Sequence, residues 1–166
     1  MFFAKFIDSM TLKIQHVTSV LSISLALLTT WVVLARYVFS GGSIALQESA
    51  LYIHATIFLL GCSVALKNSA HVRVDIFYRR MNQCAQNWLD LIGHITLLLP
   101  LCCFIFYISW DYVVSSWQIK ESSADAGGLP FVYLLKSLMP LAAGCLALQA
   151  TAEAAKALSN LLEAGK

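Results

Sequence analysis

Charge is scarce in this chain: Asp, Glu, Lys and Arg make up 12% of its 166 residues, while 59% are hydrophobic. A typical soluble domain carries charge on about a quarter of its residues. With a mean hydropathy of +0.74, the chain has too little polar surface to cover a soluble core, so the composition excludes a soluble globular domain. We expect a protein that lives in a lipid bilayer.

Catalytic and phosphate-binding motifs are also missing. The sequence has no nucleophile elbow, phosphate loop or paired carboxylates, and its Gly41–Gly42 and Gly127–Gly128 pairs fit turns before helices. The five cysteines include no C-x-x-C arrangement, and four of them lie in hydrophobic runs, which is typical of small buried side chains. We therefore expect no enzyme, no resident cofactor or metal, and no nucleic-acid partner.

What the chain does have is four long apolar runs, each near the roughly 20 residues that a membrane-spanning helix needs. They are too long for barrel strands and lack a period of two, so helices are expected. Lys136 interrupts the fourth run, and Pro100 and Pro140 should bend the third and fourth helices. The prediction is an all-α membrane protein of one domain, residues 1–166, with spans at about 17–38, 46–66, 90–112 and 129–153.

Two amphipathic segments accompany these spans. Residues 1–16 form a lead before the first span, and residues 72–89 precede the third. In both, apolar side chains recur at steps of three and four, which predicts helices lying in the membrane plane. The apolar positions are Phe3, Ile7, Met10 and Ile14 in the lead, and Val74, Phe77, Met81, Cys84 and Trp88 in the second segment.

Basic residues gather on one predicted side of the membrane. The other side has Lys120 as its one basic loop residue, beside Asp111, Glu121 and Asp125. Because lysine and arginine in short loops stay in the cytoplasm, both termini are predicted to be cytoplasmic. The basic residues on that side are Lys5, Lys13, Lys67, Arg73, Arg79, Arg80, Lys156 and Lys166.

Three charged residues at the ends of the spans are candidate structural or interface residues. Arg36 ends the first span and Glu48 opens the second, so a salt bridge between them and a contact with a partner protein are equally open. Lys136 lies roughly 9 Å along the helix past Pro130, close enough to snorkel to the outer surface. A structural role for Lys136 is therefore at least as well supported as an ion pathway.

Histidines leave a haem- or quinone-binding anchor of a respiratory complex as the alternative, with His16, His71 and His94 as candidates. His54 and His94 differ in depth by roughly 13 Å, so they cannot share one iron. A stand-alone channel would need a polar stripe along one span, which is absent, and a transporter would need more helices. The residues alone indicate an accessory subunit.

Several motifs point further. The first two spans contain WVVLARYVF (31–39), IALQESALY (44–52) and FLLGCSVALK (58–67); HVRVD (71–75), SWDYV (109–113) and GGLPFVYLLKSL (127–138) follow. Their order and spacing, over nearly the whole chain, resemble the small membrane subunit (DctQ-like) of tripartite ATP-independent periplasmic (TRAP) transporters. One departure is LQES, where the family often has Trp and two adjacent acids, so Glu48 is the only carboxylate there.

The resemblance implies one part of a sodium-coupled uptake system for an organic anion or similar small solute, in the bacterial inner membrane. Its partners would be a large elevator-type membrane subunit, which handles substrate and sodium, and a soluble periplasmic binding protein. The small subunit would be a fixed scaffold that contacts membrane lipids and adds docking surface for the binding protein. It would bind neither substrate nor sodium itself.

The segment from His71 to Arg80 would then be a cytoplasmic elbow whose arginines fix orientation. His71 and Asp75 stand four residues apart and can pair on one helical turn. Together with Arg73 they would brace the start of the in-plane helix. The full set of candidate structural or interface residues is Arg36, Glu48, His71, Arg73, Asp75 and Lys136.

Overall fold

The computed structural model describes residues 2–68, 78 and 81–164. Its elements are α1 (Phe2–Tyr37), α2 (Ile44–Lys67), α4 (Gln83–Ile92), the π-helix η1 (Gly93–Leu98), α5 (Leu99–Gln118) and α6 (Val132–Ala164). α4, η1 and α5 follow one another without a break, so the chain has four helices long and apolar enough to cross a membrane. The predicted four-helix, all-α class is confirmed, and no described residue lies in a strand.

α1 is longer than the predicted first span. Its 36 residues correspond to roughly 54 Å of helix, which exceeds the ~30 Å hydrocarbon core. The lead of residues 1–16 is therefore not a separate in-plane helix in the structure; from Phe2 it is the first part of α1. No proline or glycine interrupts the segment, and Ala4 and Ile7 are buried against Ala152 of α6, which holds the lead in line with the span.

The predicted in-plane helix at 72–89 lies partly outside the described residues. The described helix begins at Gln83, where the side chain of Asn82 caps it by accepting a hydrogen bond from the Ala85 amide at 2.9 Å. This helix continues into the third span instead of ending before it. Trp88, on the predicted apolar face, is exposed, whereas its neighbour Asn87 is buried.

A π-helical segment stands where α4 meets the third span. In the π-helix η1, backbone hydrogen bonds join residues five apart instead of four. The Leu99 amide, for example, donates to the carbonyl of His94. Pro100 follows directly, at the start of α5. A proline cannot donate the regular helical hydrogen bond, so an irregular turn immediately before it is a common way to keep the helix continuous.

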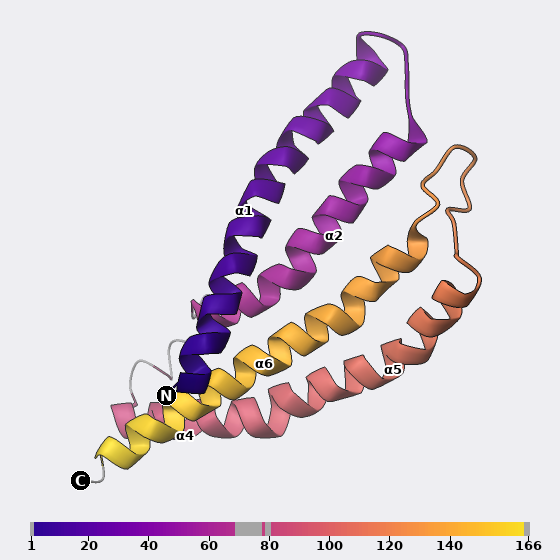
Figure 1. Ribbon diagram of the computed structural model, residues 1–166. Coiled ribbons are helices and arrows are strands. Elements are labelled where there is room, and N and C mark those ends of the chain that lie inside the picture. The colour runs from indigo at the N-terminus through magenta and orange to yellow at the C-terminus, as the bar shows by residue number, and fades with distance from the viewer. Residues whose placement is uncertain (1, 69–77, 79–80, 165–166) are drawn as a thin grey trace.

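The four long helices form a row in the order α1, α2, α6, α5, which opens like a fan (Figure 1). α1 packs on α2, α2 on α6 and α6 on α5, while α1 and α4 also contact α6 near the termini. Among the described helices, no extensive contact joins α5 to α1 or α2. The row leaves large apolar side chains exposed along its length. Among the described residues, the buried hydrophobic clusters are small and lie at the end near the termini.

Close packing in the row depends on small side chains of α6. Alanine is the most frequent buried residue of this helix, and small residues let membrane helices approach closely. The buried alanines are Ala142, Ala143, Ala150, Ala152, Ala154 and Ala157.

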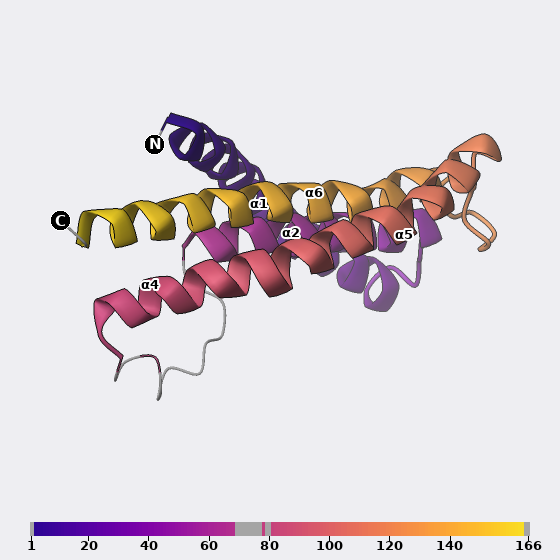
Figure 2. The ribbon, with the colours of Figure 1, turned by 90° about the horizontal axis from the view of Figure 1, so that it is seen from below.

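The two ends of the row differ. Both chain termini lie at one end, here called the terminal end (residues 2–16, 60–68, 83–98 and 149–164), as Figures 1 and 2 show. The other end, here called the loop end (residues 36–48 and 116–137), carries the two connections between helix pairs. That both termini share one side agrees with four spans; the assignment of that side to the cytoplasm stays a prediction.

Candidate functional site

A buried polar cluster joins three helices at the terminal end. Gln149 of α6, with none of its surface exposed, is at its centre. Its amide oxygen accepts a hydrogen bond from Thr11 of α1 at 2.6 Å. Its amide nitrogen donates to Asp8 of α1 at 3.1 Å and to Glu153 of α6 at 2.8 Å. The polar groups of a fully buried amide are thereby satisfied, as burial demands.

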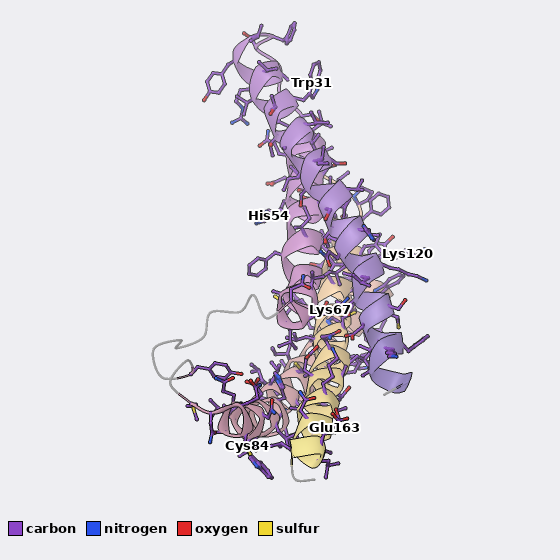
Figure 3. The ribbon with its side chains drawn as sticks, turned by 90° about the vertical axis from the view of Figure 1, so that its left-hand side faces the viewer. Trp31, His54, Lys67, Cys84, Lys120 and Glu163 are labelled. Carbon is purple, nitrogen blue, oxygen red and sulfur yellow. The ribbon has the colours of Figure 1, made fainter. Side chains whose placement is uncertain are left out.

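Lysines balance the acids of this cluster. The ammonium of Lys156 lies 2.9 Å from Asp8 and 2.8 Å from Glu153. Lys67, at the end of α2, donates to the backbone carbonyl of Asp8 at 2.9 Å, where α2 reaches the other two helices (Figure 3). We call these six residues the terminal cluster: Asp8, Thr11, Lys67, Gln149, Glu153 and Lys156. Its contacts connect α1, α2 and α6 at the terminal end.

At the loop end, Glu48 of α2 binds the connection between α5 and α6. Its carboxylate accepts hydrogen bonds from the Ser123 hydroxyl and, at 2.6 Å, from the Leu129 amide. The possible Arg36–Glu48 salt bridge is not formed among the described residues. α2 lies between α1 and α6, so a side chain aimed at the connection that leads into α6 points away from α1, and Arg36 remains exposed.

Gly128 leaves the space that this contact needs. A Cβ atom at Gly128 would lie 2.5 Å from the Ser123 side chain and 2.8 Å from a carboxylate oxygen of Glu48. Both distances are far inside van der Waals contact. A larger residue would therefore push apart the two groups that bond to each other, which makes glycine at this position a structural requirement of the Glu48 contact.

Lys136 is held by a second cluster at the loop end. Its ammonium pairs with Glu121 and lies 4.0 Å from the ring centroid of Tyr112, a distance at which cation–π attraction operates. Glu121 also accepts a hydrogen bond from Ser116 at 2.7 Å. The hydrogen bonds from Lys136 and Ser116 lower the pKa of Glu121 below its usual 4.5. Lys136 thus reaches outward to a loop carboxylate, as its position after Pro130 allows.

The remaining candidates are not brought into a common site. His71, Arg73 and Asp75 lie outside the described residues. His54 sits exposed on the outside of α2 (Figure 3), and His16 is exposed on α1. Within the described part of the chain, no three histidine, cysteine, aspartate or glutamate side chains are grouped as a metal site would require.

The terminal cluster was missed by sequence reasoning. A usable signal was present, because Gln149 is an uncompensated amide within an apolar span and such a group needs a partner. The identity of the partner was hidden, since Asp8 is 141 residues away in sequence.

The helices have long stretches without Asp, Glu, Lys or Arg, at residues 14–35, 49–66, 91–110 and 137–152; Asp111 of α5 directly follows the third stretch. All the ion pairs described above lie at one end or the other. Among the described residues, these ion pairs connect helices and loops at the two ends of the row.

Comparison with known proteins identifies the family. Residues 25–160 match the family of tripartite ATP-independent periplasmic transporters, DctQ component. The match covers most of the chain, so the chain belongs to this family and is a small membrane component of a TRAP transporter. It includes all of the loop-end contacts and the α2 and α6 parts of the terminal cluster, but begins after Asp8 and Thr11. A search of curated proteins gives no match.

Proposed function

We propose that this member of the DctQ family is the fixed, non-transporting scaffold of a sodium-coupled TRAP transporter. The transporter would take up an organic anion or a similar small solute across the bacterial inner membrane. A large elevator-type subunit would carry solute and sodium, and a periplasmic binding protein would deliver the solute. In this arrangement the terminal end faces the cytoplasm and the loop end faces the periplasm.

The observation that carries the proposal is the long charge-free stretch in the middle of each of the four spans. Secondary transporters bind their substrate near the bilayer midplane, at broken helices with exposed backbone groups. Here the described spans are continuous at mid-membrane, and the irregular η1 segment lies toward the terminal end. A row of helices without an enclosed interior also cannot form a passage by itself.

Two features support a scaffold role. The exposed apolar faces of the row offer area for another membrane protein, and α5, at one edge, contacts no helix but α6 over most of its length. The polar contacts at both ends brace the helices against relative movement. A rigid subunit with exposed apolar faces suits the static part of an elevator-type transporter, because the other part must move during transport.

In this proposal the periplasmic binding protein docks at the loop end. The Glu48–Ser123 and Lys136–Glu121 contacts hold the connection between α5 and α6 in one shape. A preorganised loop loses less conformational freedom on binding than a flexible one. Sodium and substrate selection would then reside in the other two components.

The test is isolation of the tagged chain from its native membrane in mild detergent, with identification of co-purifying proteins by mass spectrometry. The proposal expects one large multi-span membrane protein in a fixed ratio to this chain. As a control, a tagged unrelated four-span protein from the same membrane should not recover it. Isolation of the chain alone, or with redox subunits and a visible haem absorption band, would overturn the proposal in favour of a respiratory anchor.

A further inference from the structure

His54 is a polar side chain on the apolar surface of a membrane span. It is exposed and faces outward from α2 (Figure 3). Among the described residues, neither of its ring nitrogens takes part in a hydrogen bond or an ion pair. A neutral imidazole has one N–H donor and one nitrogen acceptor. Both groups therefore need partners from outside the described part of the chain.

The depth of His54 excludes water as that partner. α2 has no charged residue between Glu48 and Lys67, and Glu48 marks the loop end, where it accepts a hydrogen bond from the Leu129 amide. His54 lies roughly 9 Å further along the helix axis, at 1.5 Å per residue. Lysine can snorkel over such a distance, but one methylene group joins the imidazole to the backbone. The ring therefore stays at the depth of the hydrocarbon, where an unsatisfied polar group is costly.

The imidazole belongs to a continuous exposed face of α2. Leu51, His54, Phe58 and Cys62 follow one another at steps of three and four, which places them on one side of the helix. Leu51 and Phe58 are the two most exposed large apolar side chains of α2, at 56% and 67%. We call these four residues the His54 stripe.

An apolar hollow adjoins the His54 stripe at Cys62. It has a volume of about 180 Å³ and lies between α2, α5 and α6. Leu59 and Cys62 line it from α2, Ile105 from α5, and four residues from α6, including Ala142 and Leu146. A cavity of ~150 Å³ holds a benzene ring. The hollow therefore has room for one large apolar side chain.

The chemistry of this surface favours protein over lipid as its occupant. Acyl chains can cover Leu51 and Phe58 and can enter the hollow, but they leave both ring nitrogens of His54 without a hydrogen bond. A membrane helix of another protein can supply an apolar side chain for the hollow and a polar group for the imidazole. Polar side chains that bond across such interfaces are a recurring feature of helix packing in membranes.

We propose that the His54 stripe and the adjoining hollow bind one transmembrane helix of the large subunit. A hydroxyl, amide or carboxyl group of that helix forms a hydrogen bond with the His54 ring, and one of its large apolar side chains fills the hollow. This contact rests on the proposed function, which supplies the large subunit, and it specifies which face of the row the large subunit covers. The outer side of α1 is left to lipid.

Photocross-linking in the native membrane tests the contact directly. Phe58→benzoylphenylalanine places the reactive group in the His54 stripe, and Leu27→benzoylphenylalanine places the same group on α1, where the natural side chain is 69% exposed. We expect a covalent product with the large subunit from the Phe58 variant and none from the Leu27 variant. Equal yields from the two positions, or a Phe58 product with a second copy of this chain instead, would overturn the proposal.

Variants of His54 test the polar contact in the isolated complex. His54→Leu removes both hydrogen-bonding groups, whereas His54→Gln keeps a donor and an acceptor. We expect His54→Leu to weaken retention of the large subunit about threefold, as for a typical hydrogen bond between membrane helices, and His54→Gln to restore most of it. His16→Leu, at an exposed position of α1, is the control and should change nothing. Equal retention by His54→Leu and the natural chain would remove His54 from the interface.

A second pair of variants tests the hollow. Leu146→Trp fills it, and Leu148→Trp places the same side chain on an exposed position roughly on the opposite side of α6. We expect about tenfold weaker retention of the large subunit for the first variant and no change for the second. Circular dichroism should be the same for both. Equal retention by the two folded variants would show that no side chain of the large subunit enters the hollow.

The natural chain separates this contact from the proposed function. If the large subunit co-purifies with it but the Phe58 variant gives no product with the large subunit, the assignment of the face is wrong and the proposed function stands. If no large subunit co-purifies with the natural chain, both are overturned.

Discussion

Asp8 and Lys156 form an ion pair at 2.9 Å across 148 residues of sequence, between the beginning of α1 and the last third of α6. The pair joins the two termini of the chain at one end of the molecule. Because α1 and α6 are not neighbours elsewhere in the row, this contact and its hydrogen-bonded neighbours close the terminal end while the loop end stays splayed (Figure 1).

The first prediction concerns the coupling between these two residues. Asp8→Asn and Lys156→Met, made singly and together, should give a coupling free energy within about 0.5–3 kcal/mol, the range found for residues in direct contact. The values are measured from unfolding of the detergent-solubilised protein. A coupling indistinguishable from zero would show that Lys156 is held by Glu153 alone.

The second prediction concerns Gln149. Gln149→Leu removes the partner of Thr11 and one partner each of Asp8 and Glu153, so it should lower the free energy of unfolding by about 1–3 kcal/mol. Thermal unfolding in detergent measures it. Gln83→Leu, an exposed position at the start of α4, is the matched control and should change little. Equal stability of the two variants would contradict a structural role for the buried amide.

The third prediction concerns Gly128. Gly128→Ala should break the Glu48–Ser123 contact, because its Cβ needs the space of both side chains. Faster amide hydrogen exchange in residues 119–131 is the expected result. Gly42→Ala is the control, since a Cβ atom at Gly42 meets no atom within 4 Å. Unchanged exchange in the Gly128→Ala variant would mean that the loop shape does not depend on this contact.

The fourth prediction is a pH dependence at the loop end. The pKa of Glu121 is lowered in the folded protein by hydrogen bonds from Lys136 and Ser116. A lowered pKa means that the folded state binds the proton less readily, so the stabilisation is complete above the ordinary value of 4.5 and is lost as pH falls through the lower folded value.

Melting temperatures of the natural protein and Glu121→Gln measure this effect. The natural protein should be the more stable at neutral pH, and the difference should shrink as the pH falls below about 4.5. Asp125→Asn, in the same connection and exposed, controls for the general loss of negative charge. A difference that is independent of pH would contradict the ion pair.

The fifth prediction concerns orientation. Replacing Arg79 and Arg80 with glutamate should invert the topology or abolish stable insertion, because these arginines lie in the loop that is predicted to be cytoplasmic. Reporter fusions at the C-terminus measure the side of the membrane. Their unchanged orientation in the variant would argue against this loop as the topology signal.

Much of the fold could be predicted from local sequence. Apolar runs near 20 residues determine that helices span the membrane, and their number places both termini on one side. The position of Lys136 after Pro130 predicted that its amino group could reach outward, and the structure pairs it with Glu121. These inferences succeed because they depend on length and on distance along one helix.

Contacts between helices could not be predicted from the sequence. The lead was assigned to the membrane plane because its apolar residues lie on one face, yet that face holds Ile7, which packs on α6. Glu48 was considered with Arg36 because the two are close in sequence, whereas its partners lie in the connection to α6. Periodicity identifies a face of a helix, but not which neighbour covers it.

By itself, the sequence determined that this is a four-span helical membrane protein of the TRAP small-subunit family. Its uncharged runs cannot be stable in water, and the order of its motifs matches that family. Only the tertiary structure decided that the helices stand in a row and that Gln149 lies at the centre of the terminal cluster. Spans that are apolar on every side carry no pattern that says which face meets which neighbour, so the order of helices follows from packing and from pairing of the few polar groups.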